Sequence, residues 1–588
     1  MTRYPILRLL ISATTVMVAA CHSPSPAPSP RATERPLVAA SFPDAWRFRS
    51  RAGSPPLQEV VVSNAPLASA AGEEILAAGG NAVDAAVATG FALAVVYPSA
   101  GNIGGGGFSV TRMADGRIAA LDFREIAPRA ATHDMFIDPV THKLTDKSVI
   151  GHLASGVPGS VAGQLALLEK FGTLPRAKVM APAIRLAHGF ALDSSLARSL
   201  RGDSTRAHIC RFAGCATFYP GGNPLRPGDT LRQPVLARTL ERIAAEGPRA
   251  FYRGSVAQAI AAEMQRGGGI ITERDLADYK VAWRTPVQGK YRDHTIISMP
   301  PSSSGGTTMI ETLNILTAFG AAAPARSATD LTHILGAMQL AFIDRNEYIA
   351  DPDRIKVPVA KLIDPQYAAL QRARLADGRY VSTKQLSPGL GVHESEHTTH
   401  YSVVDRFGNA VATTTTINGG FGSYVWIPDG GFFMNNEMDD FAAQPGTPNM
   451  YGLVQGEANA VGPGKRMLSA MSPTVVLDPA GNVLLVVGSA GGPRIITGVT
   501  QILLNVIDHG MSLYDAMAAP RVHFQGLPEE VAIERAGFSP AVLDSLTARG
   551  WRFGNGAGIS SSNVGILRVR GGWEGEFDPR TSGGVAGR

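Results

Sequence analysis

The sequence predicts a mixed α/β (α+β) protein in which helices cover stacked β-sheets. Three observations favour this fold class. Segments with helical periodicity alternate with short apolar strands from Val60 onward. A chain of 588 residues, 45% hydrophobic and 18% charged, is long enough to build more than one core layer. Its 65 glycines and 40 prolines indicate many loops between the elements of such a layered fold.

The elements follow from the local patterns. Residues 69–96 are rich in alanine and divided at Gly79 and Gly80, which predicts two buried helices. A glycine-rich turn at 101–108 leads into the segments FSVTRM and IAALDFRE, whose alternation predicts a strand pair covered on one face. Further helices are predicted at 160–171, 182–188, 235–246, 256–265, 308–319 and 327–348. Further strands are predicted after Tyr401, Ala410, Thr474 and Val483.

The charge balance argues against nucleic acid as a partner. The net charge of +5 comes from 54 Lys and Arg against 49 Asp and Glu, and no basic run is clustered. The stretch LARSLRGDSTR is typical of a solvated face. The sequence also shows no internal repeat and no transmembrane helix.

The N-terminus predicts export. Two arginines precede the apolar residues 9–20, a stretch shorter than the roughly 20 residues that span a bilayer, so residues 1–20 are predicted to be a signal peptide. The stretch ends in VAAC, which resembles a bacterial lipobox with Cys21 as the lipidated first residue. An ordinary signal peptide that contains a cysteine is the alternative. Residues 21–57, rich in Pro and Ser at the start, are expected to form a disordered tether. We therefore expect a periplasmic protein with a lipid anchor.

Cys210 and Cys215 are the remaining cysteines, with four residues between them. In an oxidising compartment this spacing favours a local, structural disulfide, because a metal site would need two further ligands that are not nearby.

Two motif types are set aside. HESEH (393–397) fits the pattern of two zinc-binding histidines one helical turn apart, but it follows SPGLG and not a helix, and no third ligand follows. The loops GNIGGGGF and GSAGGP lack the Lys and Ser/Thr of a phosphate-binding loop. They are better interpreted as tight turns or as amide donors to an anion.

The segment 398–422 carries the strongest signal. Two Thr/Val-rich alternating stretches flank the turn DRFGN, which predicts a β-hairpin. If Val404 pairs with Ala410, the register places Thr398 opposite Thr416, with two hydroxyls side by side. A Thr-rich hairpin that is merely a good strand pair is the alternative explanation.

This segment resembles the signature of the gamma-glutamyltransferase family, which belongs to the N-terminal nucleophile hydrolases. The matching residues are Thr-Thr-His at 398–400, Gly408, Asn409, Val411, Thr414, Thr416, Asn418, Phe421 and Gly422. The resemblance extends through GGNAVDAAVATGFALAVVYPSAGNIGGGGF, LDFREIAP, ASGVPGSVAG, ITERDLADYKVAWRTPVQGKYR, MPPSSSGG, NNEMDDF, ANAVGPGKR, MSPT and GSAGGPRIIT. It therefore covers nearly the whole exported chain.

The resemblance implies a four-layer αββα sandwich, made as a precursor that cuts itself between His397 and Thr398. The products would be a large chain, 58–397, and a small catalytic chain, 398–588, which stay together as a heterodimer. A threonine hydroxyl is a weak nucleophile, but the freed α-amine, with a pKa of about 7.7 to 8.0, is a base on the same residue. No metal or organic cofactor is expected.

The resemblance also assigns roles to the residues of the substrate pocket. Thr416 would orient the Thr398 hydroxyl, and Asn418 would contact the amino-acid end of the substrate. Arg124 would bind the α-carboxylate, because a planar guanidinium suits bidentate recognition, while Glu437 and Asp440 would hold the α-ammonium. The amides of Gly491 and Gly492 would form the oxyanion hole.

Two departures from the family pattern concern the carboxylate end of this pocket. The usual serine pair is Ser469 and Ala470 here, and Met467 replaces a proline, so the acyl specificity is in doubt. The stretch 445–460 resembles a lid loop with Tyr451 as its aromatic gate, which favours ordinary gamma-glutamyl substrates over bulky polymers.

The predicted reaction is transfer of the gamma-glutamyl group of glutathione and related amides to water, or to amino acid and peptide acceptors. A cephalosporin or glutaryl acylase is the first alternative, and the acidic pair argues against it. A binding protein that keeps the fold without processing is the second, and the intact Thr398, Thr416 and glycine pair argue against that.

Overall fold

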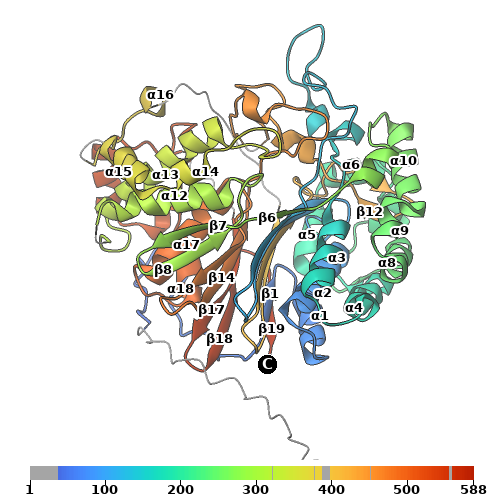
Figure 1. Ribbon diagram of the computed structural model, residues 1–588, viewed down its shortest axis with the longest axis horizontal. Helices are drawn as coiled ribbons and strands as arrows, with labels where there is room; N and C mark the ends of the chain where they lie inside the picture. Colours follow the sequence, from blue (N-terminus) through green and yellow to red (C-terminus); the bar gives the residue numbers. More distant parts are fainter. Residues whose placement is uncertain are drawn as a thin grey trace, which may run out of the picture. The chain divides into compact units, whose positions relative to one another are not determined.

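The computed structural model of the protein describes residues 37–320, 322–375, 378–386, 398–450, 452–554, 559 and 561–588. Two antiparallel sheets lie face to face in the middle, with one group of helices outside each sheet (Figure 1). This is the four-layer αββα sandwich that the resemblance implies, so the predicted fold class is confirmed.

The first sheet has seven strands, whose middle carries the hairpin of β9 (Thr399–Val404) and β10 (Ala410–Thr416). Its spatial order is β19 (Gly584–Gly587), β1 (Val60–Ser63), β9, β10, β2 (Gly106–Arg112), β3 (Ile118–Asp122) and β6 (Ala282–Arg284). The second sheet has six strands in the order β18 (Gly572–Phe577), β17 (Ser562–Val569), β14 (Val483–Ala490), β13 (Thr474–Leu477), β8 (His294–Ser298) and β7 (Val287–Tyr291). The inner strands β1, β9, β10 and β13 are fully buried because both of their faces are covered, whereas the edge strands β6, β7 and β19 are partly exposed.

Helices cover the outer face of each sheet. Over the first sheet lie α1 (Pro66–Ala77), α2 (Ala82–Val96), α3 (Ser160–Phe171), α4 (Arg176–His188), α8 (Pro234–Glu246) and α10 (Ser255–Gly267). Over the second lie α12 (Gly305–Thr317), α13 (Ala328–Tyr348), α15 (Pro365–Ala373), α17 (Arg494–Ile507) and α18 (Leu513–Ala518). Among the described residues, no helix is long and apolar enough to cross a membrane.

Three hydrophobic cores separate these four layers. One lies between the first sheet and its helices, one between the second sheet and its helices, and one between the sheets. The inter-sheet core is built from alternate strand residues such as Val60, Phe108, Ala412, Val486 and Ile566. This alternation follows from the two-residue side-chain period of a strand.

Most predicted elements are found where the sequence places them. The divided segment at 69–96 forms α1 and α2, and α3 spans its predicted residues. The predicted helix at 182–188 begins earlier, because Pro182 lies inside α4 and not in its first turn. Strands β17 and β18 and helices α17 and α18 were not predicted from the sequence.

The disordered tether was predicted to span residues 21–57, but residues 37–57 are ordered. Residues 37–57 pack against distant parts of the chain: the indole of Trp46 donates to the Ala518 carbonyl at 2.9 Å, and Arg51 forms an ion pair with Glu576. Isolated apolar residues such as Trp46 carry no periodic signal, so only tertiary contact reveals their order. Cys210 and Cys215 are joined by a disulfide near the end of helix α6 (Asp203–Arg211).

Candidate active site

The hairpin β9–β10 places the candidate nucleophile. Ala410 pairs with Val404, and the last pair of the ladder is Thr415 with Thr399. Thr398 and Thr416 follow one residue beyond that pair, at the end of the hairpin. Thr398 is 9% exposed, so its side chain lies in the wall of a cavity and not on an open surface.

A glycine-rich loop supports the Thr416 end of this hairpin. Asn102 donates to the Thr416 carbonyl at 2.9 Å and accepts from the Gly105 amide at 2.9 Å. A side chain at Gly105 would come within 2.1 Å of the same carbonyl, so only glycine permits this approach. The GNIGGGGF loop is therefore a close-packing element beneath the site.

One cavity with about 340 Å³ of empty space joins most of the predicted site residues. Those that line it are Arg124, Thr398, Thr416, Asn418, Glu437, Asp440, Ser469, Ala470 and Gly492. These residues come from both sides of the 397/398 bond and from segments that adjoin strands of both sheets. His397, Tyr451 and HESEH lie outside the described residues, as do residues 1–36 with Cys21.

The polar end of the cavity holds a buried ion-pair cluster. The Nη1 atom of Arg124 contacts Glu437, and its Nη2 atom contacts Asp440. Glu125 lies 3.7 Å from Arg124 Nη1, and all of these side chains except Asp440 are essentially inaccessible to solvent. The cluster thus presents both signs of charge to one region of the cavity.

Burial and mutual charge set the protonation of this cluster. Burial lowers the pKa of Arg124, but Glu437, Asp440 and Glu125 together raise it above its usual value. Burial raises the pKa of Glu437 and Asp440, and Arg124 opposes this rise in both. Burial raises the pKa of Glu125 to about 8, with Arg124 again opposing. Burial therefore favours the neutral form of Glu125.

Gly491 and Gly492 lie just before the N-terminus of α17. Their φ angles of 127° and 54° are in the region that favours glycine, and Pro493 follows as the residue before the helix. The partial positive charge of a helix N-terminus favours an anion at this point. This location suits the oxyanion hole assigned by resemblance.

The wall beside Arg124 is formed by residues 468–471, and the Nη2 atom of Arg124 lies 3.3 Å from the Leu468 carbonyl. The Ser469 carbonyl accepts from the Ser304 amide at 2.8 Å and from the Ser304 hydroxyl at 2.6 Å. Arg345 of α13 donates to the same Ser304 hydroxyl at 2.9 Å and lines the cavity. Arg345 and Glu125 were missed by sequence reasoning; for Glu125 the available signal was its position next to Arg124 in DFRE.

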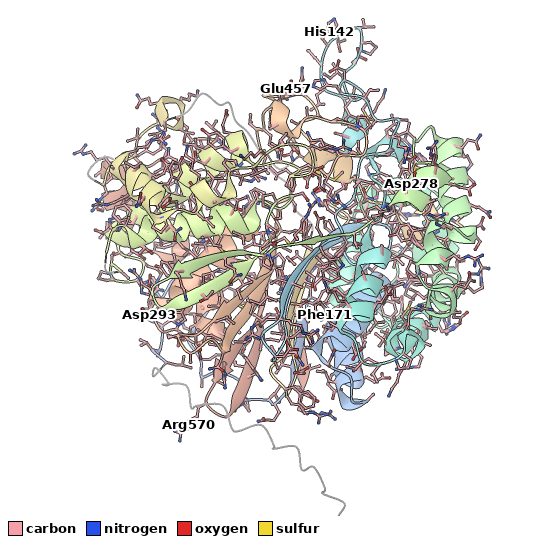
Figure 2. The ribbon with its side chains drawn as sticks, in the orientation of Figure 1. His142, Phe171, Asp278, Asp293, Glu457 and Arg570 are labelled. Carbon is pink, nitrogen blue, oxygen red and sulfur yellow. A yellow bond between two sulfur atoms is a disulfide. The ribbon has the colours of Figure 1, made fainter. Side chains whose placement is uncertain are left out.

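The lid-like segment meets the site through Asn418 and Met450. Asn418 donates to the Asn436 carbonyl at 3.0 Å and lies 3.7 Å from the Met450 sulfur. Glu457, at the far end of this segment, lies near the projecting loop that carries His142 (Figure 2). His133 of that loop has its Nε2 atom 3.3 Å from Glu457, so the two segments meet at the surface.

Comparison with known proteins places this geometry in a family. The family model for gamma-glutamyltranspeptidase matches residues 68–588. The glutathione hydrolase proenzyme of Escherichia coli (strain K12) is 46% identical over 527 residues, 89% of this chain and 90% of the relative. The Acylase ACY 1 proenzyme of Pseudomonas sp. (strain V22) is 41% identical over 502 residues, 84% and 86% of the two chains.

A solved structure extends the likeness to three dimensions. The cephalosporin acylase from Bacillus halodurans superimposes with a TM-score of 0.78 and 28% identity, covering 93% of this chain and 99% of that chain. The family model includes all the residues that line the cavity, and the chain belongs to the gamma-glutamyltranspeptidase family of enzymes.

Proposed function

We propose that this enzyme is a gamma-glutamyltransferase and glutathione hydrolase, which uses Thr398 to transfer the gamma-glutamyl group to water or to amino acid and peptide acceptors. The observation that carries the proposal is the single cavity in which Thr398 and Thr416 face the Arg124, Glu437 and Asp440 cluster. A nucleophile at one end and both signs of charge at the other suit a zwitterionic acyl group.

Maturation is the first reaction in this proposal. The Thr398 hydroxyl attacks the carbonyl carbon of His397, and the peptide C–N bond breaks to leave an ester and a free α-amine on Thr398. Water then hydrolyses the ester, which frees the hydroxyl. Cleavage is therefore the step that produces the general base.

Acyl transfer follows the same chemistry. The Thr398 hydroxyl gives its proton to its own α-amine as its oxygen attacks the donor's γ-carbonyl carbon, and the oxyanion forms beside the amides of Gly491 and Gly492. The C–N bond then breaks, and the departing amine takes the proton. Water or an acceptor amine attacks the resulting ester and restores Thr398.

Export and assembly belong to the same proposal. The signal-like residues 1–20 and Cys21 support export to the periplasm and a lipid anchor there. Strands from both sides of residue 398 share each sheet, which supports a heterodimer of large and small chains. Membrane fractionation of the wild type and of Cys21→Ala tests the anchor; equal solubility of both would contradict it.

Release of aniline from a γ-glutamyl anilide, measured together with intact mass, tests the catalytic proposal. We expect the wild type to show a small chain beginning at Thr398 and of 191 residues, the difference between 588 and 397. Thr398→Ala should abolish both cleavage and turnover. An active enzyme that remains one full-length chain would refute the mechanism.

An acylase specific for glutaryl groups is the alternative, and it has acylase relatives and the missing hydroxyl at Ala470 in its favour. The variant Asp440→Asn distinguishes the two functions, because Asp440 would be needed only for a donor with an α-ammonium. It should impair cleavage of the glutamyl anilide and not of the glutaryl anilide. A wild type that cleaves glutaryl and glutamyl anilides equally well would favour the acylase.

A further inference from the structure

Asp122, the last residue of β3, is a buried acid that holds four other residues near the candidate site. Its Oδ1 atom accepts from the Arg124 amide at 3.0 Å, and Arg466 Nε lies 3.3 Å from an oxygen of the same carboxylate. Its Oδ2 atom accepts from Arg284, through Nε at 3.2 Å and Nη2 at 3.1 Å, and from the Ser302 hydroxyl at 3.2 Å. Asp122 is not among the residues that line the cavity, so it would act there through its partners.

The contact with the Arg124 amide fixes the backbone of the candidate carboxylate receptor. An Asp side chain that accepts from the amide two residues on forms an Asx turn, which turns the chain at the end of a strand. The Arg124 carbonyl accepts from the Tyr279 hydroxyl at 2.9 Å. Both backbone groups of Arg124 are thus held, and its guanidinium enters the cavity from a fixed point.

The contacts with Ser302 and Arg466 reach the cavity wall at 468–471. The Ser302 carbonyl accepts from the Ser469 amide at 3.0 Å. The two residues after Arg466 turn their carbonyls toward Arg124, at 3.4 Å from its Nε atom and 3.3 Å from its Nη2 atom. One carboxylate of the predicted large chain therefore connects Arg124 to a wall that belongs to the predicted small chain.

Asp353 contacts the same two arginines from the solvent side. It lies 2.6 Å from Arg284 and 3.2 Å from Arg466, and its side chain is 46% exposed, whereas that of Asp122 is inaccessible. Of these two acids, Asp122 is the one whose carboxylate also contacts Arg124 and Ser302. The pair therefore offers a comparison between the arginine contacts alone and the full set of contacts.

An amide cannot reproduce the contacts of Asp122. A carboxylate accepts at both oxygens, whereas an asparagine side chain has one accepting oxygen and one donating nitrogen. Asp122→Asn must therefore turn an N–H group toward either the Arg124 amide or the Arg284 guanidinium. Removing one member of a buried ion pair also leaves its partner uncompensated. The substitution would displace the Arg124 turn or the wall without altering a group that lines the cavity.

We propose that Asp122 is a positioning residue that holds the Arg124 guanidinium and the wall at 468–471 at the separation that a substrate α-carboxylate requires. It acts by setting the backbone of Arg124 and, through its other partners, that of the wall. Thr398 is supported separately by the β9–β10 hairpin, so Asp122 affects donor binding and not the acylation step. This inference rests on the proposed gamma-glutamyl activity and deepens it by naming the residue that joins the two sides of the carboxylate receptor.

Kinetics with the γ-glutamyl anilide and two competing amides test the proposal. Glutamine carries the α-carboxylate, and 4-aminobutyramide differs from it only in lacking this group. Asp122→Asn should raise KM for the anilide and the inhibition constant of glutamine about ten- to a hundredfold, because a small misplacement of recognition groups is costly. It should change kcat by less than about threefold and the inhibition constant of 4-aminobutyramide by less than about twofold. A purely structural role would not divide the two amides in this way.

Asp353→Asn is the matched control, because it removes a carboxylate from the same two arginines and leaves the contacts of Arg124 and Ser302 in place. It should change KM by less than about twofold. Ser302→Ala is a milder second variant, which removes only the hydroxyl that joins Asp122 to the wall. It should raise KM and the inhibition constant of glutamine about two- to tenfold, again without affecting 4-aminobutyramide.

The outcomes separate this assignment from the proposed function. A wild type that releases no aniline from the γ-glutamyl anilide would refute the proposed function. In an active enzyme, an unchanged KM in Asp122→Asn, an equal weakening of both amides, or an equal effect of Asp353→Asn would overturn only the positioning role. If Asp122→Asn does not mature, Ser302→Ala decides in its place: a selective loss of glutamine binding supports the role, and a uniform loss or none overturns it.

Discussion

Ala470 is 9% exposed and lies next to Ser469 in the cavity wall. A hydroxyl added there could donate to a substrate carboxylate, and a neutral hydrogen bond contributes about 0.5 to 1.5 kcal/mol. We therefore expect Ala470→Ser to lower KM for the γ-glutamyl anilide by a few fold to about tenfold, measured by initial rates. Ala548→Ser, on the exposed side of α19 (Pro540–Ala548), is the control. An unchanged KM would mean that the cavity wall of the wild type already supplies the hydrogen bonds that the substrate carboxylate needs.

Glu125 predicts a pH dependence of substrate binding. Its pKa is raised by burial to about 8, so it is neutral at pH 7 and becomes an anion above pH 8, 3.7 Å from Arg124. The added negative charge lies beside Arg124, which lines the cavity, and opposes binding of a substrate carboxylate there, so KM for the γ-glutamyl donor should rise above pH 8. The groups that share its cluster are Arg124, Glu437 and Asp440.

Glu125→Gln isolates this titration. The variant cannot ionise at this position, so its KM should stay level above pH 8 while the pH dependence of kcat, governed by the Thr398 amine, is retained. Steady-state kinetics from pH 6 to about pH 10 would measure both. If KM still rises above pH 8 in Glu125→Gln, the titration that raises KM belongs to another group.

At the scale of elements, the hairpin β9–β10 depends on close contact with the second sheet. His400 of β9 faces β14, where its Nδ1 atom would lie 2.2 Å from a side-chain carbon added to Gly488. The ring also contacts Thr414 at 2.8 Å and Ser402 at 3.1 Å, and burial lowers its pKa to about 3. His400 is therefore a neutral spacer between the sheets, two residues from Thr398.

Gly488→Ala should destabilise the protein by about 1 to 3 kcal/mol, the usual cost of overpacking a core, and should slow self-cleavage by displacing β9. Thermal unfolding and the fraction of cleaved chain measure the two effects. Gly456→Ala is the matched control, because Gly456 has a negative φ and no atom within 4 Å of the added carbon. Equal stability of the two variants would contradict the tight sheet contact.

At the scale of the molecule, the two predicted chains are interleaved. Strand β1 of the large chain lies between β19 and β9, both of the small chain, and pairs with each. In the second sheet, β7 and β8 of the large chain extend a row of four small-chain strands. Separation of the two chains after cleavage would break the hydrogen-bond ladders in both sheets and expose the hydrophobic core between the sheets.

We therefore expect the cleaved chains to co-elute in native gel filtration and to separate only in denaturant. A tag on the C-terminus of the small chain should retain the large chain through repeated washes at high salt, because the interface is mainly hydrophobic. Loss of the large chain under native conditions would contradict the interleaved assembly.

The sequence alone determined the features that local patterns encode. The alternation around DRFGN predicted the hairpin, and the structure has the pairing of Val404 with Ala410 on which the approach of Thr398 to Thr416 depends. Glycines 79 and 80 divided α1 from α2, and the motifs along the chain identified the family. A strand register and a helix boundary depend on neighbours in sequence, so the sequence contains enough information to place them.

Only the tertiary structure decided which distant charges meet. The contacts of Arg124 with Glu437 and Asp440, and the position of Arg345 in the same cavity, join segments hundreds of residues apart. No local period predicts such contacts, because they arise when α13, the residues after β3 and the loop at 437–440 converge on one cavity. The sequence did not predict the packing of residues 37–57 for the same reason. This segment is held by distant parts of the chain and has no local pattern of its own.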